Sequence, residues 1–229
     1  LATGSRGGFV ALAAVSAVMV LLVLPRRWLA PLLVMGIVAG LPLCLSAGRF
    51  MDMSAADRVD FWGQANWAFK ENIFFGVGYD MIGEYITKSR AVHNAFVLAY
   101  AELGVFGYWF WFILLQLAIV GAWRTRTVLA ENDDPEARWL GRTAGLGISA
   151  MAGFTASAYF LSRAFVYPIF FLMAILGAMP YIAKRHFLKD LPDLIDAKQD
   201  VWIMGTIGSL VSIVYIYISI LLLNKAFHG

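Results

Sequence analysis

The sequence contains few charged residues. Aspartate, glutamate, lysine and arginine make up 14% of its 229 residues, whereas hydrophobic residues make up 61%. A soluble domain carries about 25% charged residues, so this apolar excess is too large for one soluble core and indicates folding in lipid. The basic residues stand mostly at the ends of apolar runs, which is the membrane pattern. We therefore expect membrane lipid, and no nucleic acid, as a partner.

The sequence also lacks the residue clusters of common metal and phosphate sites. Cys44 is the single cysteine, so no intrachain disulfide can form and no Cys/His set fits zinc. Metal-dependent glycosyl or phosphoryl transferases need clustered carboxylates for Mg²⁺ or Mn²⁺. The carboxylates between Asp52 and Glu84 are scattered and form no DxD pair, and no P-loop is present. We expect no metal site and no cofactor.

Long apolar runs dominate what remains. A helix needs about 20 residues to cross a bilayer, and six runs approach or exceed this length: roughly residues 8–24, 28–47, 94–122, 140–160, 164–182 and 201–223. They predict an all-α integral membrane protein with about six transmembrane helices, forming a single membrane domain over residues 1–229. The chain opens with LATGSRGG instead of methionine, so we interpret it as a fragment of a larger protein.

The connections between the runs predict their orientation. Basic residues follow the first, third and fifth runs: Arg26, Arg27, Arg124, Arg126, Arg138, Lys184, Arg185 and Lys189. The positive-inside rule makes that side cytoplasmic. Residues 48–92 then face outward, together with Arg6, the turn at Ser162-Arg163 and the C-terminus.

Residues 48–92 form the one long polar connection, and we expect a folded cap that carries short helices on the membrane surface. Ser54-Ala-Ala-Asp57 resembles a capping box at a helix start. Apolar residues then recur at helical spacing, with Arg58 at the beginning of that face. The cap is expected to place these side chains at the interface: Trp62, Trp67, Phe74 and Phe75.

The stretch ENIFFGVG, Glu71 to Gly78, ends the predicted surface helix. Gly76 and Gly78 indicate a turn or a close backbone approach, because glycine tolerates positive φ and leaves room for a neighbouring chain.

Cations gather on the outer side: Arg6, Arg49, Arg58, Lys70, Lys88, Arg90 and Arg163. The planar guanidinium suits a pyrophosphate because it donates two parallel hydrogen bonds and stays charged. Lys88 and Arg90 can also be ordinary flanking residues that reach the interface. Arg6 opens a span on the side where cations are unusual, and Arg163 sits in a short turn near the membrane. A charge at membrane depth costs about 3 kcal/mol and needs a partner or water.

His93 and Asn94 stand at the outer mouth of the third run, in the stretch KSRAVHNAFVLAYAELG. An imidazole titrates near neutrality and can take a proton from a hydroxyl, although a lone interfacial histidine can also be a hydrogen-bonding anchor. On a continuous helix Glu102 lies nearly opposite His93. We expect Glu102 to be a buried acid bonded to another helix, with Gly104 and Gly107 allowing the close approach.

In their order and spacing, these elements resemble the C-terminal half of the O-antigen ligase family. The resemblance covers about Thr3 to Ala122 and rests on four elements: TGSRGG at Thr3–Gly8, Arg58-Val-Asp-Phe-Trp62, N-x-x-F-G-x-G at Asn72–Gly78, and His93-Asn94-Ala-Phe96 with Glu102-Leu-Gly104 and Gly107. The family includes O-antigen ligases, polysaccharide polymerases and protein O-oligosaccharyltransferases of the bacterial inner membrane. One departure is Ile73, where the family often has proline.

The resemblance implies a GT-C-like helical membrane fold and a role in lipopolysaccharide biosynthesis. It implies metal-independent transfer of a glycan from undecaprenyl pyrophosphate to an acceptor hydroxyl, on a lipid A–core sugar or on Ser/Thr, in the periplasm. By position, His93 would activate the acceptor, and Arg6 and Arg58 would hold the pyrophosphate. Topology adds Arg163 and Arg49 to the pyrophosphate site. The supporting residues would be Asn94, Glu102, Trp62, Gly76, Gly78 and Arg90.

Other functions fit parts of the same pattern. A polymerase would use a second lipid-linked glycan as acceptor, and no sequence feature separates it from a ligase. A transporter of lipid-linked glycans would bind the phosphates without reaction, and substitution of His93 would then leave export unchanged. A purely structural membrane subunit would not explain why Arg6, Arg58 and His93 fall on one side.

Overall fold

The computed structural model describes residues 6–23, 53–87, 91–162 and 164–228, and this part of the chain contains helices and no strand. The helices are α1 (Arg6–Val23), α3 (Met53–Glu71), α4 (Ala95–Leu129), α5 (Pro135–Ala158), α6 (Tyr167–His186) and α7 (Thr206–His228). A short 3-10 helix, η3, spans Ile82–Glu84, and a π-helix, η5, spans Ala197–Gly205 and runs into α7.

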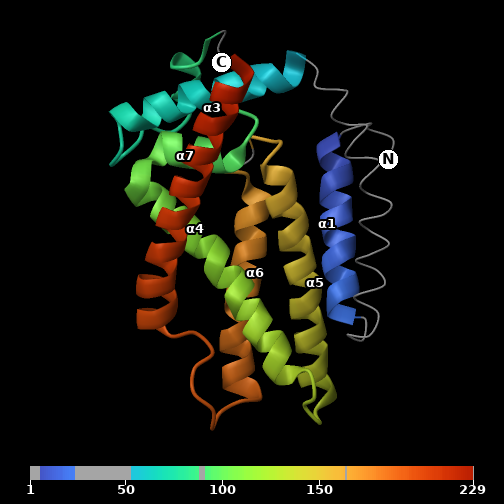
Figure 1. The fold of residues 1–229 in the computed structure, drawn as a ribbon. Helices are drawn as coiled ribbons and strands as arrows, with labels where there is room; N and C mark the ends of the chain where they lie inside the picture. Colours follow the sequence, from blue (N-terminus) through green and yellow to red (C-terminus); the bar gives the residue numbers. More distant parts are fainter. Residues whose placement is uncertain (1–5, 24–52, 88–90, 163, 229) are drawn as a thin grey trace.

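The helices form an upright bundle with one helix lying across its end (Figure 1). Helix α4 packs against α5, α6 and α7, and α1 packs against α5. Helix α3 lies across the end at which α4 begins and α7 ends, and it contacts both helices. The surface helix predicted after residue 52 therefore lies at the end of the bundle, as a cap.

Three of the described helices are long and apolar enough to cross a membrane: Ala95–Leu129, Tyr167–His186 and Ala197–Lys225. Helix α1 contributes a shorter apolar stretch, Val10–Leu22. The all-helical class predicted from the sequence is confirmed for the described residues, and the three candidate spans fit the predicted membrane protein. The run predicted at 28–47 lies outside the described residues, so the count of six spans stays a prediction.

Polar residues fix the points at which α4 and α5 begin. The Asn94 side chain accepts hydrogen bonds from the backbone N–H groups of Phe96 and Val97, at 3.0 and 3.2 Å. The Asp134 side chain accepts one from Glu136 at 2.8 Å, with Pro135 in the first turn. Both caps satisfy N–H groups that a helix start leaves without a partner.

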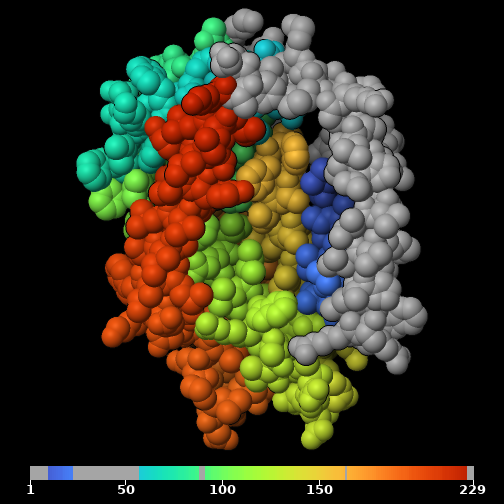
Figure 2. Space-filling view, viewed as in Figure 1, coloured from blue at the N-terminus to red at the C-terminus, as the bar shows by residue number. Residues whose placement is uncertain are grey.

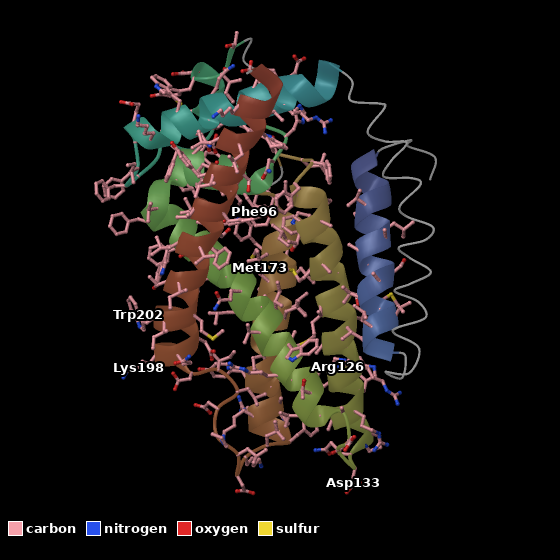
Figure 3. All side chains as sticks on the ribbon, in the orientation of Figure 1. Phe96, Arg126, Asp133, Met173, Lys198 and Trp202 are labelled. Atoms are coloured by element: carbon pink, nitrogen blue, oxygen red, sulfur yellow. The ribbon has the colours of Figure 1, made fainter. Side chains whose placement is uncertain are left out.

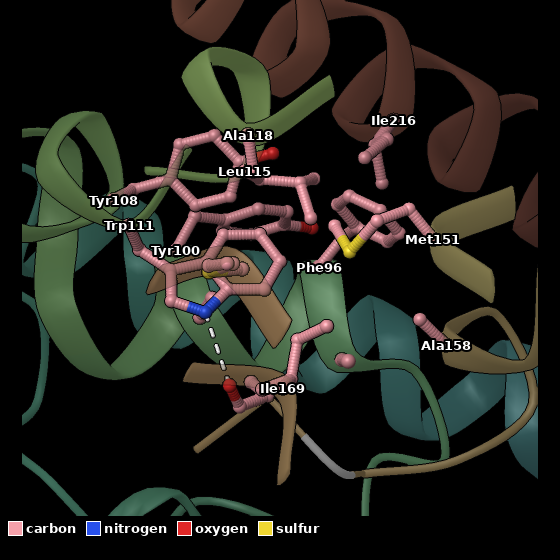
Figure 4. Close-up of a cluster of buried hydrophobic side chains, with 14 of the residues drawn as sticks. Phe96, Tyr100, Tyr108, Trp111, Leu115, Ala118, Met151, Ala158, Ile169 and Ile216 are labelled. Atoms are coloured by element: carbon pink, nitrogen blue, oxygen red, sulfur yellow. Dashed lines mark hydrogen bonds between the residues drawn. The ribbon is translucent and has the colours of Figure 1, made fainter. Parts of the chain in front are cut away.

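Aromatic residues of α4 form the core directly beneath the cap (Figure 4). Tyr100 and Tyr108 are fully buried, and the ring of Phe96 packs edge-on against Trp111 with centroids 5.4 Å apart. The Trp111 indole donates a 3.0 Å hydrogen bond to the Ala164 carbonyl. This bond ties α4 to the chain just before α6.

The outer surface of the bundle is apolar. Along α7, which crosses the front face in Figure 2, the side chains of Val211, Val214, Tyr215 and Leu222 are exposed. In water such a surface would be an association site, but lipid solvates it without cost. The exposed face of α7 therefore fits contact with membrane lipid.

Basic residues lie at the end of the bundle away from α3 (Figure 3). Arg126 donates a 2.5 Å hydrogen bond to the Leu22 carbonyl at the end of α1. Arg124 forms a two-pronged ion pair with the buried Asp200 carboxylate, with N–O distances of 2.5 and 2.7 Å. Lys184 and Arg185 close α6 at the same end.

Candidate active site

Helix α3 is fixed onto the start of α4 by polar side chains. The Trp62 indole N–H donates a 2.7 Å hydrogen bond to the Val92 carbonyl. Asn66 is 2% exposed; its amide accepts a hydrogen bond from the Tyr100 hydroxyl and donates one to the Tyr217 carbonyl at 3.2 Å. Arg58 precedes Trp62 by one helical turn and is partly exposed, so it shares the face of α3 that lies near residue 92.

His93 occupies the turn between that docking point and the cap of α4. Its backbone has a φ of 54°, in the left-handed region that few residues other than glycine adopt. Its backbone N–H donates a 2.6 Å hydrogen bond to the Ser162 hydroxyl, and its side chain is partly exposed. The Trp62–Val92 bond on one side and the Asn94 cap on the other hold this conformation in place. Such strained positions occur often at functional sites.

Helix α4 is broken at Gly104, where φ is 65° and ψ is −172°. The break leaves carbonyls before it and N–H groups after it without partners in the helix. The turn after α3 supplies both kinds of partner. The N–H groups of Val77 and Gly78 donate to the carbonyls of Ala101 and Glu102, each at 3.0 Å.

The same turn also accepts hydrogen bonds from the second part of α4. The N–H groups of Val105 and Phe106 donate to the carbonyls of Ile73 and Phe74, at 2.8 and 3.2 Å. The turn is thus inserted into the hydrogen-bond ladder of α4, and its four bonds pair two carbonyls before the break and two N–H groups after it.

Glycine is required at two points of this junction. A Cβ atom on Gly76 would meet the backbone carbonyl of Glu102, and one on Gly104 would meet that of Phe74. Gly76 and Gly78 also have positive φ, at 68° and 100°. The turn and close approach that we predicted at Gly76 and Gly78 are therefore present. Gly104 differs from our expectation, because it admits the turn after α3 and not a neighbouring helix.

Glu102 is buried beside this junction, with 2% of its surface exposed. Its carboxyl faces the backbone N–H groups of Asp80 and Ile82. The sequence led us to expect a partner on another helix, and the structure replaces it with the loop around η3. The loop can present two N–H groups to one carboxyl because Asp80 adopts a φ of 62°.

A polar cavity of about 450 Å³ opens where the η3 loop, the start of α4 and the α5–α6 turn meet. Asp80, Glu102 and Ser162 give it polar groups, and Tyr79 and Phe165 give it aromatic ones. We did not predict Tyr79, Asp80 or Ser162 as site residues. The predicted turn at Gly76 and Gly78 directly precedes Tyr79 and Asp80 in the sequence. No motif around Ser162 indicates a functional role.

The structure brings together six of the predicted site residues and leaves others undescribed. Six lie at the junction of α3, its following turn and the start of α4: Trp62, Gly76, Gly78, His93, Asn94 and Glu102. Arg49, Arg90 and Arg163 lie outside the described residues. Arg6 begins α1 at the same end of the bundle, but its side chain is not described. The convergence of Arg6, Arg58 and His93 on one cavity stays a prediction.

Comparison with known proteins gives a family for the first part of the chain. Residues 1–112 match the family model described as O-Antigen ligase. The match ends within α4 and includes α1, α3, the glycine turn, His93 and the break at Gly104. No curated protein and no solved structure matches the chain.

Proposed function

Because residues 1–112 match the family model described as O-Antigen ligase, we propose that this membrane protein is a glycosyltransferase of the O-antigen ligase type. It transfers a glycan from undecaprenyl pyrophosphate to an acceptor hydroxyl, such as that of a lipid A–core sugar. The reaction takes place at the periplasmic face of the bacterial inner membrane.

The observation that carries this proposal is the position of His93. It stands at the membrane end of the cap, on a left-handed backbone fixed by Ser162, Trp62 and Asn94. A catalytic base needs a fixed position next to its substrate. A membrane-anchored donor and a water-borne or lipid-borne hydroxyl would meet at this depth.

In the proposed reaction, the His93 imidazole takes the proton of the acceptor hydroxyl. The hydroxyl oxygen then forms a bond to the anomeric carbon of the donor glycan. The bond between that carbon and the pyrophosphate oxygen breaks, and undecaprenyl pyrophosphate leaves with the electron pair. Arg6 and Arg58 stabilise the negative charge that grows on the leaving group, with Arg49 and Arg163 as further candidates.

The residue types favour a mechanism without metal. A pyrophosphate is already a good leaving group, and guanidinium groups supply positive charge where a metal ion would otherwise do so. The carboxylates of the outward segment are scattered along the sequence, and no group of three or more metal ligands occurs among the described residues.

The orientation follows from the distribution of charge. Arg124, Arg126, Lys184 and Arg185 lie at the end of the bundle opposite α3. Cytoplasmic ends of membrane helices carry such cations. Residues 48–92 then form a periplasmic cap within one membrane domain.

An assay with purified components tests the proposal. Full-length protein is mixed with an undecaprenyl-pyrophosphate-linked glycan and lipid A–core, with and without EDTA, and the glycosylated product is measured. We expect transfer to lipid A–core at an unchanged rate in EDTA. A strict requirement for Mg²⁺ would contradict the metal-free mechanism. A product in which one donor glycan has been joined to another would identify a polymerase instead.

A further inference from the structure

The cavity beside His93 has the dimensions and lining of a small-molecule site. Its volume of about 450 Å³ lies within the range of roughly 300–1,000 Å³ that is usual for ligand pockets. Three separate segments form its wall: the loop around η3, the start of α4 and the turn between α5 and α6. Because these segments are far apart in the sequence, the cavity forms only when the bundle is folded, as is usual for a ligand-binding site.

The cavity shares a wall with His93. Ser162 lines the cavity and accepts the 2.6 Å hydrogen bond from the His93 backbone N–H. Val92, the preceding residue, also lines it, and its carbonyl is held by Trp62. A ligand in this cavity therefore contacts two residues that hold the His93 backbone in place, although His93 itself is not among the lining residues.

The lining combines aromatic rings with carboxylates. The ring of Tyr79 is 69% exposed, and it packs at a tilt against Phe165 with centroids 5.5 Å apart. The Glu102 carboxyl lines the cavity, and a carboxylate has about four acceptor positions, so it can accept hydrogen bonds from a ligand as well as from the nearby backbone. Aromatic faces bind the C–H surface of a sugar ring, and carboxylates accept hydrogen bonds from its hydroxyls.

We infer that this cavity binds the sugar residue that carries the acceptor hydroxyl. The inference rests on the proposed function. Tyr79 and Phe165 supply the apolar platform, and Asp80 and Glu102 are positioning residues that orient the hydroxyls toward His93.

The two carboxylates in the described lining suit the hydroxyls of an acceptor sugar. The charged side chains that the structure describes in the lining, Asp80 and Glu102, are both acidic. Two carboxylates repel a diphosphate, whereas a neutral sugar gains hydrogen bonds from them. A serine side chain of a protein acceptor would use one hydroxyl and leave the aromatic platform empty.

Protection from chemical labelling tests the inference without any turnover. The full-length protein, with Cys44→Ser and no other cysteine, carries Gly83→Cys and is treated with a membrane-impermeant maleimide. Gly83 lines the cavity, and a Cβ atom there meets nothing within 4 Å, so the variant leaves the aromatic platform intact. The probes are the free oligosaccharide of lipid A–core, undecaprenyl pyrophosphate and a serine-containing peptide. At about ten times its Kd, the oligosaccharide leaves about one tenth of the sites free, so the labelling rate should fall roughly tenfold.

The matched control is Asp60→Cys. Asp60 is exposed on α3 and lies two residues before Trp62, so it points away from the face that docks on α4. Its labelling rate should not change with any probe. Protection of Gly83→Cys by undecaprenyl pyrophosphate alone, by the peptide alone, or by no probe would overturn the inference.

Kinetics give a second readout. Glu102→Gln and Asp80→Asn should each raise the KM for acceptor roughly tenfold by weakening a charge-assisted hydrogen bond, with the KM for donor unchanged. Equal changes in both KM values would mean that these residues support the site as a whole and do not hold the acceptor. If the oligosaccharide protects the cysteine variant but the wild-type protein transfers no glycan, the proposed reaction fails while the sugar site stands.

Discussion

Gly76 and Gly104 meet through their backbones where the turn after α3 enters the break in α4. Gly104 combines a φ of 65° with a ψ of −172°, a region that is essentially restricted to glycine and costs other residues about 1–3 kcal/mol. A methyl group there would also meet the Phe74 carbonyl.

At the residue scale, we therefore predict that Gly104→Ala lowers the free energy of unfolding by at least about 2 kcal/mol. The measurement is thermal unfolding in detergent, followed by tryptophan fluorescence. Gly177→Ala is the control, because a Cβ atom at Gly177 in α6 meets nothing within 4 Å, and alanine is the better helix former by about 1 kcal/mol. Equal effects of the two substitutions would contradict the inserted turn.

Single residues show which features of the candidate site could be predicted from the sequence and which could not. The turn at Gly76 and Gly78 could be predicted because positive φ favours glycine locally. The role of Gly104 could not, because its partner is a turn that lies before His93 in the chain. The same holds for Glu102, which lines the cavity together with Asp80 and Ile82, and for Ser162, which accepts a hydrogen bond from the His93 backbone.

At the scale of elements, a buried ion pair joins α4 to η5. The Asp200 side chain is 0% exposed and that of Arg124 is 36% exposed. Asp200 also accepts a 2.8 Å hydrogen bond from the Asp196 backbone, and Arg124 donates to the Leu194 carbonyl at 2.8 Å. The pair holds the segment between α6 and α7 against the last turns of α4.

The two partners should respond unequally to substitution. Arg124→Gln leaves a buried carboxylate without its cation, and removal of one partner of a buried pair costs about 3–5 kcal/mol. Because Arg124 is partly exposed, we expect about 2–3 kcal/mol for Arg124→Gln, and less for Asp200→Asn, after which the arginine can turn to solvent. Thermal unfolding of each variant checks this order.

The control pair is Lys184 and Asp193, whose charged atoms are 3.9 Å apart with Asp193 78% exposed. Asp193→Asn should cost less than about 0.5 kcal/mol, as for most surface pairs. A larger loss from Asp193→Asn than from Arg124→Gln would show that burial does not govern these pairs.

The described helices follow the predicted apolar runs, since hydropathy is a local property of the chain. The ends of the helices follow the hydropathy of the chain less well. We predicted that the third run ends near residue 122, but α4 continues to Leu129. The extension is stable because Arg124 and Arg126 find partners at Asp200 and Leu22, which lie far away in the sequence. The π-helix at Ala197–Gly205 has no signal that we recognised.

At the scale of the whole molecule, the cap and the basic end lie at opposite ends of the bundle, and the proposed orientation puts them on opposite faces of the membrane. Tyr79→Cys and Asp133→Cys, each in a background without other cysteines, should therefore differ in cells with a permeabilised outer membrane. A membrane-impermeant maleimide should label Tyr79→Cys and should leave Asp133→Cys unlabelled until the inner membrane is opened. The reverse pattern would invert the proposed topology.

Helix pairing was beyond sequence reasoning, because apolar side chains facing lipid and apolar side chains facing another helix have the same hydropathy. The packing of α1 on α5 illustrates this. A Cβ atom at Gly153 would meet the Val15 side chain, so the glycine sets the closeness of the two helices. The sequence contains that glycine but does not show which helix packs against it.

The most direct test of the account is the rate of glycan transfer by full-length His93→Ala in the purified system. General base catalysis contributes about 10²–10⁴-fold to a rate, so we predict a loss of at least about 100-fold. Thermal stability and binding of undecaprenyl pyrophosphate should stay unchanged. Transfer within about threefold of the wild-type rate would contradict the central claim that His93 is the base of this reaction.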